Sequence, residues 1–349
     1  MDIKVIDKNM ADAKKNNDTF EWLKGLDKPF TIHGLYWVKE NKNFHRLRDS
    51  LNTRQYLKDL SAHPSGAYIS FATDSTSIQL RVKNSSAAYM AHMSACGQGG
   101  LDLYFLNKDS YTFLTTTKIN KAEYEITLIK NMDKKMRSFR LYLPLYIALL
   151  DLEIGFDCGS TVLECEPIRE NKIICYGTSI SQGGCATRPG MNYSSILERL
   201  LKKYEVYNFG FSGNAHLDYE VATDLATITN TKYIIIESES NNTCERTKEK
   251  LYNFIKILTE GNPNVKVFVL SHFPHPNENI NEDFNKNLKK HKAIHKAICK
   301  QFDDNVIYVD GDKILKQFHY EETVDNVHLT DLGFYFVAKY CEKLIKKFE

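Results

Sequence analysis

The sequence lacks the features that mark membrane and nucleic-acid-binding proteins. Its first residues contain no apolar stretch of secretory length, and no later run is long and apolar enough to span a bilayer. Neither sign of charge dominates, because 46 Lys and Arg residues balance 44 Asp and Glu residues and the formal net charge is +2. We therefore expect neither a nucleic-acid nor a membrane partner.

The sequence also has no obvious disulfide framework or metal site. Its eight cysteines form no CxxC pair, which is typical of reduced thiols, so we expect a cytoplasmic protein. The histidines of the first half are scattered. The pairs His272/His275 and His291/His295 have no evident third ligand, and we interpret the second pair as part of a helix surface. We expect no metal and no cofactor. The sequence indicates nothing about oligomeric state.

What the sequence does have is a globular composition in two differently patterned halves. With 349 residues, of which 42% are hydrophobic and 26% charged, it is long for one domain. Short alternating strands separated by turn residues fill the first half, and residues 30–38 read as one of them. This pattern predicts an all-β sandwich, or jelly roll, over residues 1–168.

From about residue 170 the pattern changes to strand, loop and helix. The fully apolar run at 233–236 is typical of a strand buried on both faces of a parallel sheet. Helices are predicted at about 192–204, 218–228, 244–258 and 332–348, with another between 280 and 298. Alternating strands and helices predict an α/β domain over residues 169–349. In such a domain the site lies at the carboxyl ends of the strands.

The stretch 172–184 places a serine at such a position. An apolar strand ends at Gly177, Ser179 follows, and a glycine-rich turn comes next. This is how an α/β fold exposes a nucleophile. Asp325 and His328 follow the last strand and lie three residues apart, so in a helical turn they would share a face and could form a triad with Ser179. The N–H groups of Ser179 and Gly213 and the Asn241 side chain are candidate oxyanion donors.

These segments resemble the SGNH (GDSL-type) hydrolase superfamily. Residues 177–183 (Gly-Thr-Ser-Ile-Ser-Gln-Gly) are similar to its first block, with Thr178 where Asp is commonest. Residues 208–214 are similar to its second block, and Asp325-x-x-His328 to its fifth. In the first half, Gly100-Leu101-Asp102-Leu103-Tyr104 resembles the GxDLY signature of one subfamily. The resemblance implies a jelly roll followed by a three-layer, flavodoxin-like hydrolase domain with a parallel sheet.

The third block departs from the superfamily, because Gly-x-Asn-Asp is absent. Either Asn241 or Asn242 could be the donor, and the distance past the strand favours Asn241. Gln182, Arg188 and Asn242 are candidates for substrate binding, although Arg188 could instead form a salt bridge between the domains. Glu237 and Glu239 could be additional acid–base groups, but charged residues at a strand end are usually solvated or paired. Cys175 and Cys185 flank the serine without a nucleophile signature.

The resulting hypothesis is a metal-free serine esterase or deacetylase. It would cleave a small acyl ester, acetyl above all, from a small molecule or a carbohydrate. Two alternatives remain. An acyltransferase would use the same nucleophile with a sugar hydroxyl in place of water, and a catalytically weakened carbohydrate-binding protein would account for the irregular third block.

Overall fold

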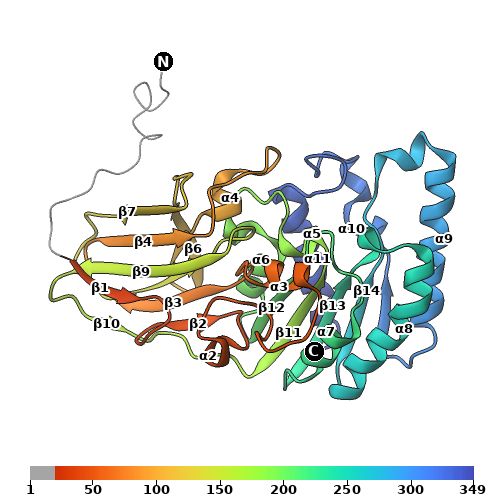
Figure 1. The fold of residues 1–349 in the computed structure, drawn as a ribbon, viewed down its shortest axis with the longest axis horizontal. Helices are drawn as coiled ribbons and strands as arrows, with labels where there is room; N and C mark the ends of the chain where they lie inside the picture. Colours follow the sequence, from red (N-terminus) through yellow and green to blue (C-terminus); the bar gives the residue numbers. More distant parts are fainter. Residues whose placement is uncertain (1–19) are drawn as a thin grey trace.

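The computed structural model describes residues 20–349, and its first half forms two antiparallel sheets (Figure 1). One has the order β1 (Phe20–Lys24), β9 (Leu149–Asp157), β4 (Ile78–Asn84) and β7 (Glu123–Ile129). The other has the order β10 (Val162–Leu163), β3 (Tyr68–Thr73), β8 (Arg137–Tyr142), β5 (Asp102–Asn107) and β6 (Ser110–Thr116), with β2 (Thr31–His33) paired to β3. The predicted antiparallel sheets of the first half are confirmed over residues 20–168, whereas residues 1–19 of the predicted domain lie outside the described residues. The jelly-roll connectivity stays a prediction.

The core of this half consists of aliphatic and aromatic side chains from both sheets. It includes Ile69 and Phe139 from one sheet and Leu80 and Ile154 from the other, all fully buried. In β4 two buried residues near the end of the strand alternate with two exposed ones, as expected where one face is covered and the other meets water. The sandwich is therefore held by the inward faces of two patterned sheets.

The prediction of one strand over residues 30–38 is wrong. The strand ends at His33, because Gly34 takes a φ of +77° and a Cβ there would lie 3.0 Å from Ala67 Cα. The chain then runs through α2 (Val38–Asn41) and α3 (Gln55–Ser61) across the second half of the molecule. We call residues 35–61 the strap. Its side chains Trp37, Leu47 and Leu57 pack into the core of the second half.

The second half contains a five-stranded parallel sheet. Its order is β12 (Tyr204–Gly210), β11 (Asn171–Gly177), β13 (Thr231–Glu237), β14 (Lys266–Leu270) and β15 (Val306–Val309). This is the flavodoxin-like order. One face is covered by α6 (Tyr193–Leu200) and α11 (Asp331–Lys346), and the other by α7 (Tyr219–Ala226), α8 (Cys244–Gly261) and α9 (Glu282–Cys299). The predicted three-layer α/β architecture is confirmed.

Short elements complete the chain. They are α4 (Ala95–Gly99), α5 (Ser179–Gln182), α10 (Asp312–Leu315) and the 3₁₀ turns η2 (Pro189–Met191), η3 (Glu239–Asn241), η4 (Pro276–Asn279) and η5 (Lys316–Phe318). The predicted boundary at 168 falls between β10 and β11. This boundary separates the strands of the two halves. It does not separate their cores, because side chains of the strap pack into the core of the second half. The two-domain division stays a prediction.

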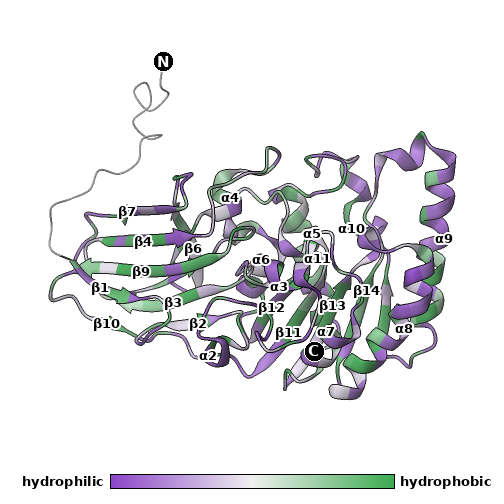
Figure 2. Cartoon of the chain, viewed as in Figure 1, coloured by the Kyte–Doolittle hydropathy of each residue, from purple (hydrophilic) through white to green (hydrophobic). Residues whose placement is uncertain are grey.

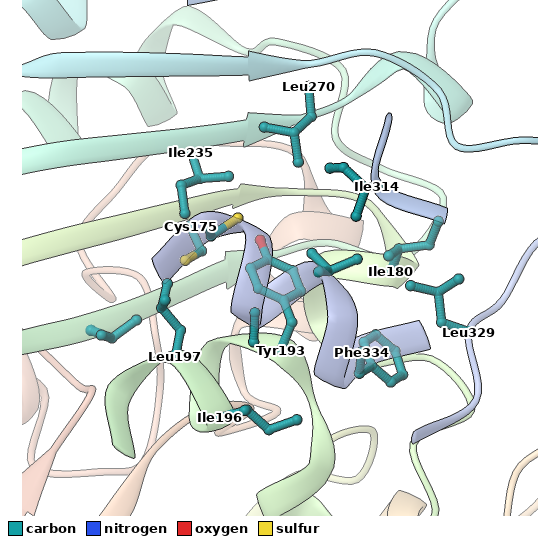
Figure 3. Close-up of a cluster of buried hydrophobic side chains, with 14 of the residues drawn as sticks. Cys175, Ile180, Tyr193, Ile196, Leu197, Ile235, Leu270, Ile314, Leu329 and Phe334 are labelled. Carbon is teal, nitrogen blue, oxygen red and sulfur yellow. The ribbon is translucent and has the colours of Figure 1, made fainter. Parts of the chain in front are cut away.

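Apolar strands form the centre of the second half. Figure 2 shows the strands of the parallel sheet as hydrophobic, whereas α9 is mostly hydrophilic. In Figure 3, Tyr193 of α6 and Phe334 of α11 pack with Cys175 of β11 and Ile235 of β13. No helix within residues 20–349 is long and apolar enough to cross a membrane. All eight cysteines are free thiols.

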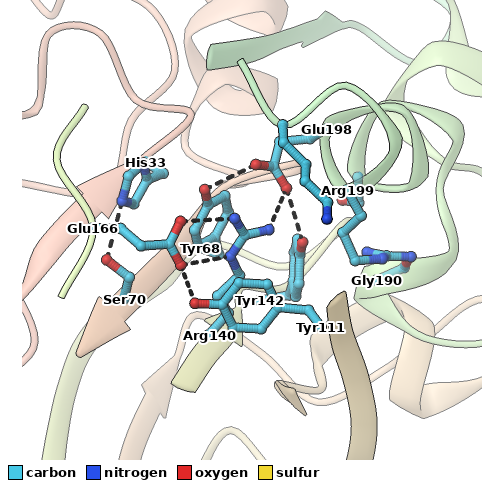
Figure 4. Close-up of polar contacts among 12 residues, drawn as sticks. His33, Tyr68, Ser70, Tyr111, Arg140, Tyr142, Glu166, Gly190, Glu198 and Arg199 are labelled. Carbon is cyan, nitrogen blue, oxygen red and sulfur yellow. Dashed lines mark hydrogen bonds and ion pairs between the residues drawn. The ribbon is translucent and has the colours of Figure 1, made fainter. Parts of the chain in front are cut away.

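A buried ionic network joins the two halves (Figure 4). Arg140 of β8 donates to Glu166 and to Glu198 of α6, at 2.7 Å in each case. Tyr68 and Tyr142 also donate to Glu198, and Arg169 pairs with Glu166 and Glu198. Because removing one member would leave a buried charge without its partner, this network fixes how the sandwich sits against the α/β sheet.

Candidate active site

Ser179 lies where β11 ends, as the first residue of α5. Thr178 caps this helix through its side chain, and Gly183 ends it with a φ of +105°. The predicted glycine-rich turn is therefore a one-turn helix. Gly177 is required at the strand end, because a Cβ there would lie 2.2 Å from Ser181 Oγ and 2.3 Å from the Glu237 carbonyl oxygen. The turn consequently packs tightly against β13, and Ser179 is 7% exposed.

The structure brings Ser179, His328 and Asp325 into one hydrogen-bonded chain. His328 Nε2 lies 2.8 Å from Ser179 Oγ, and His328 Nδ1 lies 2.8 Å from Asp325 Oδ2. The second carboxylate oxygen of Asp325 accepts from the backbone N–H groups of Val327 and His328. Burial alone would raise the pKa of Asp325, but these hydrogen bonds and the His328 ring lower it. The carboxylate is thereby kept charged beside the imidazole.

Asp325 and His328 meet in a loop and not in the helical turn that the sequence predicts. Asn326 has a φ of +74°, and the backbone N–H of Val324 donates to the His328 carbonyl oxygen. An aspartate that accepts from the N–H groups two and three residues later forms a side-chain turn of its own. This turn replaces helical geometry in holding the two side chains together.

Two of the three predicted oxyanion donors have free N–H groups in suitable loops. Gly213 follows β12 with a φ of +67° and is exposed, and its N–H has no partner among residues 20–349. Asn241 lies in η3 after β13, where its Oδ1 accepts from the Ala215 N–H at 3.3 Å. Its Nδ2 has no partner within the described chain. The assignment of these groups to an oxyanion hole stays a prediction.

Asn242 is used differently. Its Nδ2 donates to the carbonyl oxygens of Ala215, at 2.8 Å, and of Ser238, at 2.6 Å. These bonds tie the loop after β13 to the loop after β12. Between the two candidate asparagines, the geometry therefore favours Asn241 as the residue with a free amide, and Asn242 as its support.

Glu237, at the end of β13, accepts hydrogen bonds from the turn that carries Ser179. Its Oε2 accepts from the Thr178 hydroxyl at 2.7 Å, from the Thr178 N–H at 3.3 Å and from Ser181 Oγ at 3.1 Å. Burial raises the pKa of Glu237 to about 7, although these hydrogen bonds oppose the shift. The sequence indicated only a charged strand end. In the structure Thr178, which replaces the common Asp, is paired with this glutamate.

The structure does not support direct substrate contact by Gln182. This residue is fully buried: its Nε2 donates to the Leu145 carbonyl oxygen at 3.0 Å, and its Oε1 accepts from the Ser212 N–H at 3.0 Å. Its amide therefore links α5 to the loop that carries Gly213. Both ends of the amide are occupied, by backbone groups and by the His63 ring at 3.1 Å from Nε2, so these contacts favour a supporting role, and substrate binding by Gln182 stays a prediction.

Arg188 forms the interdomain salt bridge that the sequence left as an alternative. Its guanidinium donates to Asp102 Oδ2 at 2.9 Å and to the Tyr104 hydroxyl at 2.5 Å, and it lies over the Phe113 ring. Asp102 and Tyr104 belong to the GxDLY-like segment. That segment therefore supports the turn after Ser179 and places Arg188 in the joint between the halves.

Loops of the sandwich half brace the site, which sequence reasoning missed. The Tyr146 hydroxyl donates to the Ser179 carbonyl oxygen at 3.1 Å, and Ser65 Oγ donates to the Gln182 carbonyl oxygen at 2.5 Å. From the strap, Arg54 donates to the side chain and carbonyl oxygen of Asn214, beside Gly213. The sequence feature that marks these contacts is the run Tyr142-Leu143-Pro144-Leu145-Tyr146, which contains Tyr146.

Another sandwich loop lies over the triad. The side chain of Gln98 binds the backbone of Tyr89, Met90 and Met93 and so fixes the loop 85–94. The ring centroid of His92, in this loop, is 5.6 Å from that of His328. Tyr89, in the same loop, is 67% exposed. This loop therefore reaches the triad from the other half of the chain.

The interpretation of His291 and His295 as a helix surface is wrong. Both are buried, on the face of α9 that is directed at Glu239, and His295 Nδ1 lies 3.5 Å from that carboxylate. Burial raises the pKa of Glu239 to about 7 and lowers the pKa of each histidine to about 4. Glu239 belongs to η3, which also carries Asn241. The two histidines therefore pack against the turn that positions Asn241.

The cysteines that flank Ser179 are poor nucleophiles. Burial raises the pKa of Cys175, and burial together with the charge of Asp325 raises the pKa of Cys185 to about 12. Because the thiolate is the reactive form, burial disfavours both thiols as nucleophiles. Ser179 is the one of these three side chains with a base in hydrogen-bond contact.

The comparisons with known proteins agree with this architecture. Residues 170–346 match the family model described as the GDSL-like lipase/acylhydrolase family, and residues 20–162 match the one described as the N-terminus of SGNH-hydrolase-type esterases. The two matches span both halves of the described chain. No curated protein sequence matches the chain.

Solved structures share the fold along nearly the whole chain. A protein from Bacteroides ovatus described as a GDSL-like lipase is 27% identical, with a TM-score of 0.87 over 94% of this chain and 98% of that one. The salicylyl-acyltransferase SsfX3 from a tetracycline biosynthetic pathway is 16% identical, with a TM-score of 0.74 over 94% and 97%. A family two carbohydrate esterase from Cellvibrio japonicus is 10% identical, with a TM-score of 0.61 over 94% and 98%.

Proposed function

The chain belongs to the GDSL-like lipase/acylhydrolase family and is an esterase, and we propose that it removes small acyl groups, acetyl above all, from carbohydrate esters with Ser179 as its nucleophile. The observation that carries the proposal is the chain of two 2.8 Å contacts from Asp325 through His328 to Ser179 Oγ. A serine hydroxyl needs such a base to become nucleophilic at neutral pH.

In the proposed reaction, Ser179 Oγ attacks the ester carbonyl carbon while His328 Nε2 takes the hydroxyl proton. Asp325 holds Nδ1–H and stabilises the imidazolium that forms. The oxyanion is bound by the N–H groups of Ser179 and Gly213 and by Asn241 Nδ2, each typically worth about 3–4 kcal/mol in the transition state. His328 then gives its proton to the leaving alcohol. Water, activated by His328, releases the acid from the acyl-enzyme.

Three features support a small acyl group on a polar alcohol. Ser179 is only 7% exposed, at the start of a tightly packed turn, which favours a small acyl group. The loop 85–94 places the His92 imidazole 5.6 Å from the His328 ring and carries the exposed Tyr89, and such groups are suited to a sugar face and its hydroxyls. The family two carbohydrate esterase from Cellvibrio japonicus has the same fold.

The test is hydrolysis of p-nitrophenyl acetate and of acetylated oligosaccharides by the purified protein. We expect Ser179→Ala to abolish both activities and labelling by a fluorophosphonate probe. The control Ser110→Ala changes an exposed serine at the sandwich edge and should leave them unchanged. Equal hydrolysis by Ser179→Ala and the parent protein would refute Ser179 as the nucleophile.

An acyltransferase is the second candidate, because SsfX3, with the same fold, is described as a salicylyl-acyltransferase. The same acyl-enzyme would then pass its acyl group to a hydroxyl in place of water. Product analysis with an acyl donor and excess sugar separates the two: an acylated sugar as main product indicates the transferase, and free acid indicates the hydrolase.

A further inference from the structure

Three side chains with metal-binding atoms meet at the entrance to the site. One ligand atom each from His92, Cys185 and His328 lies within 4.8 Å of the others, the one such group in residues 20–349. His92 comes from the sandwich loop 85–94, Cys185 from the turn after α5, and His328 from the loop before α11. They are far apart in the sequence, so no spacing motif could reveal them.

The backbone holds Cys185 against His328. Cys185 has a φ of +74°, a conformation that non-glycine residues rarely adopt. The preceding residue must be small, since a Cβ at Gly184 would lie 2.9 Å from His328 Cδ2 and 2.9 Å from the Tyr146 hydroxyl. Cys185 is 5% exposed and His92 is exposed. The group therefore has a fixed inner part and a solvent-facing third ligand.

Two imidazoles and one thiolate are a donor set that favours Zn²⁺, with an open fourth position. Asp325 already binds His328 Nδ1, which is the carboxylate support that zinc-binding histidines usually have. Tetrahedral zinc ligands lie about 3.3–3.7 Å apart, and the three ligand atoms lie within 4.8 Å of one another, so each pair has to close by about 1.5 Å at most. His92 is the exposed member of the group and so the ligand with the most freedom to rotate toward the other two.

We propose that His92, Cys185 and His328 form an inhibitory zinc site that spans the two halves of the molecule. Zn²⁺ binds His328 Nε2 in place of the Ser179 hydroxyl, and the thiol of Cys185 releases its proton to solvent as the Zn–S bond forms. With its nitrogen occupied, His328 no longer accepts the serine proton. The esterase is therefore switched off while zinc is bound and recovers when zinc leaves.

The first experiment measures binding without activity. Ser179→Ala protein is titrated with Zn²⁺ against a chromogenic chelator, and we expect one site per chain. Adding Cys185→Ala or His92→Ala to this variant should weaken binding at least tenfold, whereas Cys158→Ala, which changes an exposed thiol, should not. Unchanged affinity in both ligand variants would overturn the proposal. This readout stands even if the esterase assignment fails.

The second experiment measures inhibition of p-nitrophenyl acetate hydrolysis by Zn²⁺ in a non-chelating buffer. Each variant is compared with its own rate without zinc. The parent protein and Cys158→Ala should be inhibited alike and recover with EDTA. His92→Ala and Cys185→Ser should need at least tenfold more zinc. His92 is exposed, so its variant is a test that does not depend on the packing around Cys185. Equal inhibition of all four proteins would contradict the proposal.

Discussion

The molecule contains two serine–histidine–carboxylate chains of similar geometry. In one, Ser179, His328 and Asp325 meet at the strand ends with 2.8 Å contacts. In the other, His33 Nε2 lies 3.0 Å from Ser70 Oγ and its Nδ1 lies 3.1 Å from Glu205. The first chain is open, with His328 23% and Asp325 36% exposed, whereas His33 and Glu205 are 0% and 1% exposed.

Their surroundings explain why only the open chain is a candidate for catalysis. His33 is stacked on Tyr68 at 4.4 Å between ring centroids, and Glu205 also receives the Gly34 N–H and Arg169. Burial opposes the charge of Glu205, but His33 and Arg169 outweigh it and lower its pKa. No substrate can reach this chain. Hydrogen-bond geometry alone therefore does not define a catalytic triad; access and oxyanion donors are also required.

The two chains should differ most in their response to replacement of their histidines, His328 and His33. His328→Ala should lower kcat/KM by about ten-thousand-fold with little change in stability, because it removes the base. His33→Ala should lower the free energy of unfolding by about 3–5 kcal/mol, because Glu205 is left buried beside a void. Urea unfolding and p-nitrophenyl acetate kinetics on both variants check this. A folded His33→Ala protein with lost activity per molecule would break the comparison.

The next effect concerns Glu237, the buried carboxyl group that accepts hydrogen bonds from the Ser179 turn. Because burial raises the pKa of Glu237 from 4.5 to about 7, its contribution to stability is full below pH 4.5 and is lost as the pH rises to about 7. The loss is on the order of 3 kcal/mol. We expect Glu237→Gln to remove this decline between pH 4.5 and 7 in urea unfolding.

Asp325 serves as a control, because its pKa is shifted in the opposite direction. Its pKa is lowered, so its contribution is present above its unfolded pKa and disappears as the pH falls. Asp325→Asn should therefore lower the free energy of unfolding at pH values above the unfolded pKa of Asp325, and the difference from the parent protein should vanish as the pH falls below the folded pKa. If Glu237→Gln instead changed stability equally at every pH, the proposed protonation of this buried carboxyl would be wrong.

A third effect tests the candidate oxyanion donors of the chain that contains Ser179. Asn241→Ala should lower kcat by about a hundredfold, with a smaller change in KM, because an oxyanion donor acts in the transition state. Asn242→Ala is the matched control, since its amide binds backbone carbonyl groups. It should cost about 1 kcal/mol of stability and lower kcat less than tenfold. A reversed order would make Asn242 the donor.

The smallest effect belongs to an exposed histidine–carboxylate pair on the surface. His45 Nδ1 lies 2.6 Å from Asp49 Oδ1, with the two side chains 32% and 44% exposed. Exposed pairs of this kind contribute roughly 0–1 kcal/mol. Asp49→Ala should therefore change the melting temperature by a few degrees at most and leave esterase kinetics unchanged. A larger loss would show that exposure does not set the value of these pairs.

The sequence predicts the parts of the site that follow strand ends. Apolar strand periodicity places the ends of β11, β12 and β13 together, so Ser179, Gly213 and Asn241 could be named before their distances were known. The same holds for the three-layer fold. Asp325 and His328 could be named from their spacing, although the loop that joins them could not.

The rest depends on contacts between distant segments. Glu237 is a charged strand end in the sequence, and only packing shows that it lies under the nucleophile turn. The polar residues of α9 indicate a surface helix, whereas His291 and His295 are buried at Glu239. Gln182 and Arg188 were expected at the substrate because they are near Ser179 in sequence. Their partners, Leu145 and Asp102, come from the other half.

The strap has a consequence for how the protein is made. Synthesis runs from the N-terminus, so Trp37, Leu47 and Leu57 leave the ribosome long before the strands that cover them, including β12. Arg46 is also synthesised before its partners, because its buried guanidinium donates to the carbonyl oxygens of Asn208 and Gly210. The first sheets can pair early, but the nascent chain carries an uncovered apolar segment until the parallel sheet is translated. The two halves therefore finish folding together.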